Sequence, residues 1–325
     1  MEEQVFQPRT DLTEFSEAVD SLRGQIKKII VGQDEMVRLI ITALLADGHV
    51  LIEGVPGVAK TLTAKLVAKS LAVQFSRIQF TPDLMPSDVL GTPVFNPREA
   101  SFEFKKGPLF SNIVLIDEIN RAPAKTQAAL FEVMEEKQIT VDGRTYTMQS
   151  PFMVMATQNP IEQEGTYRLP EAQLDRFLFK IMVPYPGEAE ELQILSQFHN
   201  MGNENPVLSV EPVLNAEKIA MLKKQVKTIV MDEKLLQFIA HLVHSTRHHK
   251  SIYLGGSPRA SLAIMNASKA IAAINGRDFV TPEDILEVVP PILRHRIILS
   301  PDKEMEGVTE DAVIKQIIQS MDIPR

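Results

Sequence analysis

Cysteine and tryptophan are absent from this 325-residue sequence, and tyrosine occurs only four times. The lack of cysteine excludes disulfides, thiolate metal sites, iron–sulfur clusters and cysteine nucleophiles. Also missing is any run near the roughly 18 apolar residues that a membrane-spanning helix needs. The start, Met1-Glu2-Glu3, is acidic and lacks the basic and apolar pattern of a signal peptide. Together these absences predict a cytoplasmic protein without a membrane segment.

A basic excess is missing as well. Asp and Glu number 42 against 34 Lys and Arg, which gives a net charge of −8. Because a protein that coats nucleic acid carries a basic surface, we expect no nucleic acid as a partner. At roughly 100–200 residues per domain, the length predicts two domains.

Short apolar runs alternate with helical patterns in the first half of the chain. Buried strands that alternate with helices are typical of an α/β fold with a doubly wound, mostly parallel sheet. The sequence therefore predicts a five-stranded core over residues 1–186, which also contains an N-terminal helix. The five expected strands are residues 49–52, 75–80, 113–116, 152–156 and 177–183, and helical periodicity marks residues 61–71 and 124–137.

Pro184-Tyr185-Pro186-Gly187 interrupts this alternation and indicates a hinge. Residues 187–325 then predict a smaller, all-helical domain. Its expected helices are 188–198, 216–227, 232–248, 258–275, 282–288 and 309–321. Ser257-Pro258 and Thr281-Pro282 suit helix starts, because a capping hydroxyl precedes a proline at the first helical position.

Two segments of the core depart from the alternation. Residues 138–147 predict a β-hairpin around Asp142-Gly143, which is a preferred two-residue turn. Residues 81–107 form a proline-rich insertion after the second strand. The insertion also carries Phe95, Phe102 and Phe104.

A loop that suits phosphate binding follows the first strand and opens a helix. Its backbone N–H groups would surround the phosphates of a nucleotide, with Lys60 against the phosphate oxygens and the Thr61 hydroxyl on Mg²⁺. Alanine stands at position 59, where the general pattern has glycine, and it fits there if its φ is negative. The alternative is a strand–helix turn with an incidental Lys-Thr. The expected binding residues are Gly54, Val55, Pro56, Gly57, Val58, Ala59, Lys60, Thr61 and Leu62.

Polar residues follow two further strands. Asp117 and Glu118 end the third apolar run, at the edge where parallel sheets bind ligands. Asp117 would hold Mg²⁺, and Glu118 would polarise the water that attacks the terminal phosphate. Asn159, after the fourth run, could hydrogen-bond both that phosphate and the water. The alternatives are an acidic helix start for the first pair and an ordinary Asn-Pro turn for Asn159.

In this order the motifs resemble those of the AAA+ ATPases, and within them the MoxR family closely. The resemblance extends from Val31-Gly32-Gln33 to Ser257-Pro258-Arg259. Between these lie the phosphate loop, residues 115–121, residues 156–160 and residues 169–177. It implies a P-loop (AAA+) core with a helical lid, ATP and Mg²⁺ as ligands, and tolerance of alanine at position 59.

The resemblance also implies roles that spacing alone does not. Arg176 resembles an arginine finger supplied to the ATP of a neighbouring subunit, and Arg259 a second sensor that reaches the γ-phosphate of its own subunit. Val31, Gly32 and Gln33 would line the adenine pocket. The alternatives are an ion pair between Arg176 and Asp175, and an exposed helix-start charge for Arg259. Arg168 stands where relatives commonly have proline.

From the same resemblance we expect a hexameric ring that remodels, matures or assembles a protein client. Such maturation could include insertion of a metal or cofactor into the client. A von Willebrand factor A domain protein is the expected partner. The insertion and the hairpin would contact a client, unless the three phenylalanines only pack the insertion together. The rival interpretations are a magnesium-chelatase-like motor subunit, a nucleic-acid motor, and a nucleotide-gated scaffold.

Two weaker signals lie in the second half. His241, His244 and His248 share one helical face, which predicts a solvated or partly packed face rather than a metal site. Residues 293–296, Leu-Arg-His-Arg, are locally basic, but they are short and isolated in an acidic chain.

Overall fold

The computed structural model describes residues 11–55, 57–141, 143–159, 167, 169–201 and 205–324. Pro56, Asp142, Pro160 and Arg168, which the sequence interpretation singled out, lie outside these ranges. Within them, no helix is both long and apolar enough to cross a bilayer.

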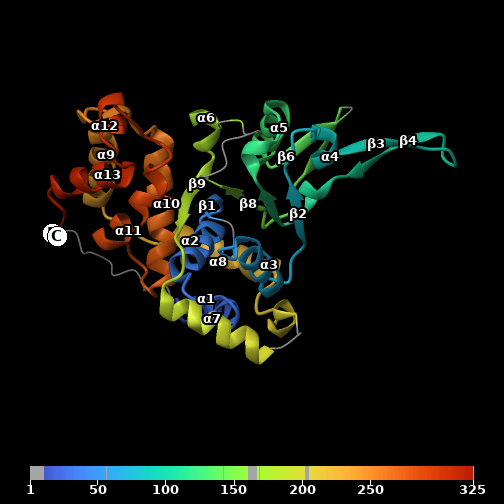
Figure 1. Cartoon of the computed structure of the whole chain (residues 1–325), viewed down its shortest axis with the longest axis horizontal. Helices are drawn as coiled ribbons and strands as arrows, with labels where there is room; N and C mark the ends of the chain where they lie inside the picture. Colours follow the sequence, from blue (N-terminus) through green and yellow to red (C-terminus); the bar gives the residue numbers. More distant parts are fainter. Residues whose placement is uncertain are drawn as a thin grey trace, which may run out of the picture.

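A five-stranded sheet forms the centre of the molecule (Figure 1). Its order is β2-β5-β8-β1-β9, and every neighbouring pair is parallel, which confirms the predicted core. The strands are β1 (His49–Gly54), β2 (Phe75–Gln79), β5 (Ile113–Asp117), β8 (Met153–Gln158) and β9 (Phe177–Val183).

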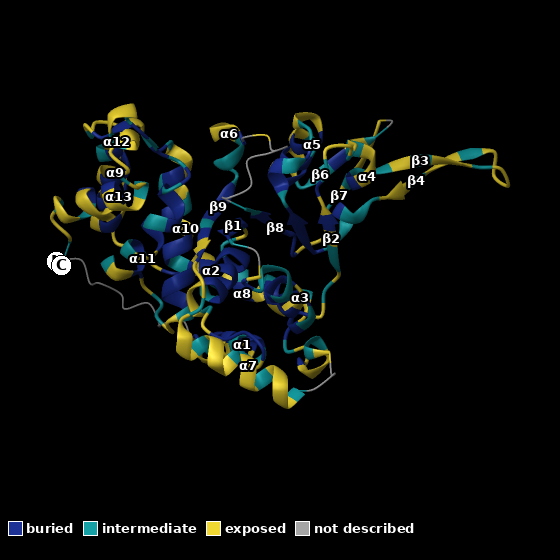
Figure 2. Ribbon diagram, in the orientation of Figure 1, coloured by how far each residue is buried: buried dark blue, intermediate teal, exposed yellow. Residues whose placement is uncertain are grey.

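Alternate side chains of the strands enter two apolar clusters, one on each face of the sheet. Val50 and Ile52 of β1 join the cluster formed with α1, α2 and α3. Leu51 between them joins the cluster formed with α5. These helices are α1 (Thr13–Lys27), α2 (Asp34–Leu45), α3 (Lys60–Ser70) and α5 (Ala124–Glu136). Burial on both faces explains why the strands read as continuous apolar runs (Figure 2).

The insertion contains the short helix α4 (Pro86–Leu90) and an antiparallel hairpin, β3 (Gly91–Asn96) with β4 (Ser101–Lys106). This hairpin projects from the body as an arm (Figure 1). Phe95 and Phe102 pack on each other near its tip, with ring centroids 5.3 Å apart, yet they are 51% and 67% exposed. Phe104 instead packs at the base of the arm, against Phe110 and Tyr146. Only Phe104 therefore packs onto the body.

The one hairpin that the sequence predicted, at residues 138–147, is present as β6 (Gln138–Val141) and β7 (Arg144–Thr147). The hairpin of the insertion was not predicted. Three short elements complete the core. They are η1 (Pro108–Phe110), η2 (Ile119–Arg121) and α6 (Glu171–Leu174).

The second half is helical, as predicted, apart from a two-stranded pair, β10 (Ile252–Leu254) with β11 (Ile298–Leu299). Its other elements are α7 (Glu188–Met201), η3 (Pro206–Ser209), α8 (Ala216–Thr228), α9 (Glu233–Thr246), α10 (Pro258–Ile274), α11 (Pro282–Leu293), α12 (Pro301–Met305) and α13 (Glu310–Gln319). The sequence interpretation ended α11 at residue 288, but the helix continues through Pro290 and Pro291.

Capping differs between the two predicted helix starts. Thr281 forms a capping box with Asp284, as expected. Ser257 does not cap α10, because its hydroxyl donates to the Asp175 carboxylate at 3.2 Å. The Ser257 side chain, which was predicted to cap its own helix, therefore connects the second half of the chain to the core.

Further contacts join the two halves. Arg38 of α2 forms an ion pair with Glu287 of α11 at 2.5 Å. Arg294, His295 and Arg296 approach backbone carbonyls of β9, and one apolar cluster contains residues of both halves. A domain boundary at Pro186 therefore stays a prediction.

Candidate nucleotide-binding site

The phosphate-binding loop connects the end of β1 to the start of α3, which begins at Lys60. The Lys60 ammonium donates to the Gly54 carbonyl at 2.6 Å, so its side chain lies back across the loop. Gly57 has a φ of 89°, a left-handed conformation that glycine adopts without a side-chain clash.

Ala59 has a φ of 58°, so the expectation of a negative φ at this position is wrong. The turn from the loop into α3 requires the left-handed region here, and this explains why glycine is the general choice. An alanine side chain in that region costs roughly 1–2 kcal/mol.

A cavity of about 290 Å³ lies beside this loop. Val31 and Gln33 line it together with Gly57, Val58, Ala59 and Leu62, whereas Gly32 is not among the lining residues. Pro186, Ile194 and Phe198 close it from the hinge and α7, and the sequence interpretation missed these three residues. The lining is mostly apolar, which suits the flat faces of a nucleotide base.

Gly32 explains how α7 comes so close to the Val31–Gln33 segment. Its φ is 70°, and a β-carbon there would collide with the Glu190 carboxylate. Glu190 in turn accepts a hydrogen bond from the backbone N–H of Gly187 at 2.8 Å. Glycine at position 32 therefore allows the hinge and the first turn of α7 to pack over the cavity.

Asp117 is the last residue of β5 and is only 7% exposed. One of its carboxylate oxygens accepts from the Arg77 side chain at 2.6 Å, and the other from the Thr157 hydroxyl at 3.2 Å. This arrangement places an oriented carboxylate at the carboxyl edge of the sheet, on the strand that was predicted.

Glu118 follows with a φ of 58°, which turns its side chain away from the direction of the strand. Its carboxylate accepts a hydrogen bond from Gln79 at 2.8 Å and forms an ion pair with Arg121 at 3.2 Å. Its backbone N–H donates to Thr157 at 3.1 Å. The partners of the acidic pair come from β2, β8 and η2, and the local sequence gave no signal for them.

Asn159 directly follows β8, the strand between β5 and β1. Gln158 pairs with Glu53, the residue before the loop's first glycine. The parallel register therefore brings the ends of β5, β8 and β1 together at one edge of the sheet. This edge carries the phosphate-binding loop, the acidic pair and Asn159.

Arg176 lies at the opposite edge. It precedes β9, whose first residue, Phe177, pairs with His49 at the start of β1, whereas Val183 pairs with Gly54 at its end. Arg176 is therefore separated from the loop by about the length of β1, roughly 17 Å. Its guanidinium forms an ion pair with Glu135 at 2.8 Å, not with Asp175.

Arg259 lies beside Arg176 and not beside Lys60. Its guanidinium contacts the other oxygen of Glu135 at 2.5 Å. The expectation that Arg259 reaches a phosphate of its own subunit does not match this arrangement, because α10 starts at the edge that carries Arg176. Loss of water on burial raises the pKa of the Glu135 carboxyl. The hydrogen bond from Arg259 and the charge of Arg176 together lower it by more, so the pKa of Glu135 lies below its ordinary value.

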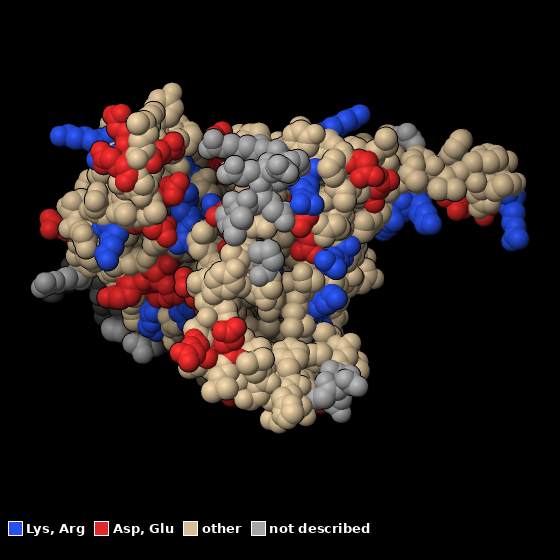
Figure 3. Space-filling view, in the orientation of Figure 1, with Lys and Arg blue, Asp and Glu red and all other residues tan. Residues whose placement is uncertain are grey.

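The weaker sequence signals have structural explanations. His244 in the last turn of α9 and His248 just beyond its end are exposed, and their rings lie tilted to each other with centroids 4.5 Å apart. Among the described residues, no group of three or more His, Asp or Glu could hold a metal ion. Arg294 and Arg296 donate to carbonyls of β9 and to Asp311 and Asp175. Figure 3 shows acidic and basic side chains intermixed on the visible face.

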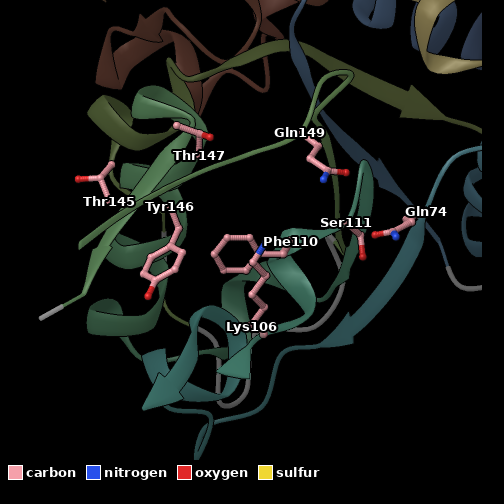
Figure 4. A pocket seen from close by; sticks show the side chains of 9 residues that line it. Gln74, Lys106, Phe110, Ser111, Thr145, Tyr146, Thr147 and Gln149 are labelled. Carbon is pink, nitrogen blue, oxygen red and sulfur yellow. The ribbon is translucent and has the colours of Figure 1, made fainter. Parts of the chain in front are cut away.

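A second hollow, of about 620 Å³, lies at the edge of the sheet where β2, β5 and β8 begin (Figure 4). Gln74, Ser111 and Gln149 line it from the residues before these strands. Phe110 and Tyr146 face each other across it, and Lys106 lies over the Phe110 ring at 5.1 Å. It is separate from the phosphate-binding loop, which lies at the other edge of the sheet.

Comparisons with known proteins show which class of protein has this fold. Residues 49–179 match the ATPase family associated with various cellular activities (AAA), and residues 244–317 match the AAA lid domain. The fold and the site therefore define an AAA ATPase with its lid.

Three similar proteins show which family of AAA ATPases this chain resembles over most of its length. An uncharacterized protein of Bacillus subtilis, YeaC, is 46% identical over 92% of each chain. Chaperone MoxR1 of Mycobacterium tuberculosis is 44% identical over 93% of this chain and 81% of its own. A crystal structure from Cytophaga hutchinsonii, assigned as an ATPase, superposes with a TM-score of 0.89 at 41% identity and covers 97% of both chains. The chain belongs to the MoxR family of AAA ATPases, and it is an ATP-hydrolysing enzyme.

Proposed function

We propose that this ATPase works as a ring in which Arg176 and Arg259 of one subunit complete the ATP site of the next. The position of both arginines carries this proposal, because they lie at the edge of the sheet opposite to the phosphate-binding loop. A residue that serves a neighbour's site requires a head-to-tail interface, and such an interface closes into a ring or runs on as a spiral. A hexamer is the state that the family resemblance implies.

Within a subunit, the loop at residues 54–61 would hold the phosphates through its backbone N–H groups and Lys60. The base would occupy the 290 Å³ cavity beside Val31 and Gln33. A hydroxyl and a carboxylate are the oxygen ligands that Mg²⁺ prefers, so Thr61 and Asp117 fit as its holders. Bound there, Mg²⁺ would neutralise charge on the phosphates.

Glu118 and Asn159 would act on the attacking water. Glu118 lies one residue beyond the buried Asp117, where its carboxylate can accept a proton from a water molecule near the terminal phosphate. Asn159 ends the neighbouring strand and would orient that water through its neutral amide. Arg176 and Arg259 would stabilise the negative charge that accumulates on the transferred group, an effect worth roughly 10³–10⁵ in rate for such arginines.

Mixing two inactive variants tests the shared site. We expect Arg176→Ala and Lys60→Ala each to lose ATP turnover. Their mixed rings should regain it, because Lys60→Ala subunits supply Arg176 to intact loops of the other variant. A chain with both substitutions, mixed with Lys60→Ala, is the control and should stay inactive. No recovery of phosphate release would contradict the proposal, once co-purification of differently tagged variants shows that the rings are mixed.

We propose further that the cycle remodels or assembles another protein, with a von Willebrand factor A domain protein as partner. Similarity to a relative named as a chaperone supports this. So does the arm formed by β3 and β4, whose exposed Phe95 and Phe102 offer an apolar contact. The net charge of −8 favours a protein client over nucleic acid.

A variant that holds ATP would identify the client. Glu118→Gln removes the carboxylate that polarises the water, so we expect ATP binding to persist while turnover falls by about 10²–10⁴. Affinity capture of this variant in ATP, with mass spectrometry, should then retain a protein that wild type in ADP releases. Full turnover in Glu118→Gln would contradict the role of Glu118. DNA-stimulated turnover that weakens with salt would contradict the protein-directed function.

A further inference from the structure

Glu135 joins the two arginines that the proposed function places at the subunit edge. It lies in the last turn of α5, and each of its carboxylate oxygens contacts a different guanidinium. Arg176 contacts one oxygen at 2.8 Å and Arg259 contacts the other at 2.5 Å. These three residues come from α5, the segment before β9, and α10.

The two arginines depend on Glu135 to different extents. Arg176 is also held by the Ala172 carbonyl at 2.7 Å and lies over the Phe131 ring at 5.9 Å. Arg259 is 54% exposed, and no other described residue accepts a hydrogen bond from its side chain. The contact with Glu135 is therefore what ties the Arg259 guanidinium to the core and sets its place beside Arg176.

Two guanidinium groups repel each other when both approach one point. A carboxylate between them offsets this repulsion and fixes both orientations through charge-assisted hydrogen bonds. On this basis we infer that Glu135 is a positioning residue, which holds Arg176 and Arg259 side by side so that they meet the neighbour's ATP as a pair. The inference rests on the proposed trans role of these arginines.

The variant Glu135→Gln keeps the shape of the side chain but removes its charge and one acceptor. We expect kcat to fall by roughly 10- to 100-fold, the scale of a small misplacement of a catalytic group. KM for ATP and ring assembly should stay unchanged, because the subunit's own loop and cavity are intact. Glu136→Gln is the matched control, since Glu136 is exposed in the same turn and forms no ion pair with a described residue.

A combined variant separates positioning from a general structural effect. If Glu135 acts through both arginines, adding Glu135→Gln to the Arg176→Ala/Arg259→Ala variant should not slow turnover further. Multiplied losses would overturn the inference, and so would a wild-type kcat for Glu135→Gln in assembled rings. Wild-type turnover in Arg176→Ala would instead refute the proposed function itself.

Folding is checked by thermal melting and light scattering before the rates are compared. If Glu135→Gln fails to assemble, Glu135→Asp replaces it. Aspartate keeps the charge but is one methylene shorter, so it can hold only one arginine well, and an intermediate kcat is expected. A kcat equal to that of wild type in assembled Glu135→Asp rings would overturn the inference.

Discussion

Two of the described non-glycine residues with a positive φ lie at the candidate nucleotide site. Ala59 and Glu118 both have a φ of 58°, although neither is glycine. Residues held in this region cost of order 1–3 kcal/mol and persist only where surrounding contacts enforce them. For Glu118 those contacts are Gln79, Arg121 and Thr157. The strain thus places the carboxylate off the axis of β5, where a strand residue could not put it.

His49 is a buried residue whose protonation should affect the stability of the whole core. Its Nδ1 accepts from the Val154 N–H at 3.0 Å, so Nε2 carries the proton and donates to the Met134 carbonyl at 3.1 Å. Burial lowers the pKa of His49 from 6.5 to about 4, despite the hydrogen bond to Met134. Both ring nitrogens are used in the neutral form, so the folded state resists a second proton.

The unfolded chain therefore binds more protons than the folded one between pH 6.5 and about 4. We expect the free energy of unfolding to fall as the pH decreases through this window, by about 3 kcal/mol from His49. Urea unfolding at a series of pH values measures this slope, which His49→Gln should reduce. His241→Gln, at an exposed position on α9, is the control. An unchanged slope in His49→Gln would be evidence against this linkage.

At the scale of elements, the residues after α11 hold the second half onto β9. The Arg296 side chain is only 4% exposed and pairs with Asp175 at 2.6 Å. It also donates to the carbonyls of Phe177 and Leu178 at 2.7 and 3.1 Å. His295 donates to the Phe177 carbonyl as well, at 2.9 Å. Burial and the charge of Arg296 hold the pKa of His295 well below 6.5, so its ring is neutral.

Arg296→Met should break this attachment while keeping most of the side-chain volume. Because Asp175 would be left without its buried partner, we expect a loss of about 3–5 kcal/mol in the free energy of unfolding. Lys303→Met is the control, since the Lys303–Glu306 pair is exposed and should contribute less than about 1 kcal/mol. Denaturant unfolding followed by circular dichroism compares the two. Losses of equal size would show that the Arg296 contacts do not stabilise the junction.

Helix α5 links the two edges of the sheet within one subunit. It starts three residues after the end of η2, which follows the acidic pair. Gln127 of α5 donates to the carbonyls of Ile119 and Ala122 at 3.1 Å. Its 13 residues span about 20 Å and end at Glu135 and Glu136. A rigid helix therefore runs from the residues around the acidic pair to the edge that carries Arg176 and Arg259.

At the scale of the whole molecule, the features that could be predicted from the sequence are those that a local pattern of residues determines. The apolar runs predicted all five strands of the sheet, and the loop at residues 54–61 indicated where the candidate nucleotide-binding site lies. Contacts between distant residues were not predicted, because no local pattern reports them. Ser257 was assigned to a helix cap and instead contacts Asp175, and Glu135 carried no signal at all. Phe198 of α7 lines the 290 Å³ cavity together with Val31 and Gln33, although more than 100 residues separate it from them in the sequence.

The attachment at β9 has a consequence for how molecules of this chain can meet. β9 is the last strand on its side of the sheet, and an uncovered outer strand is a template on which a foreign strand can add. Here the carbonyls of Phe177, Leu178 and Lys180 accept from His295, Arg296 and Arg294. The helical half thus blocks this side against sheet extension. Association between copies of this chain at this side is therefore left to side chains.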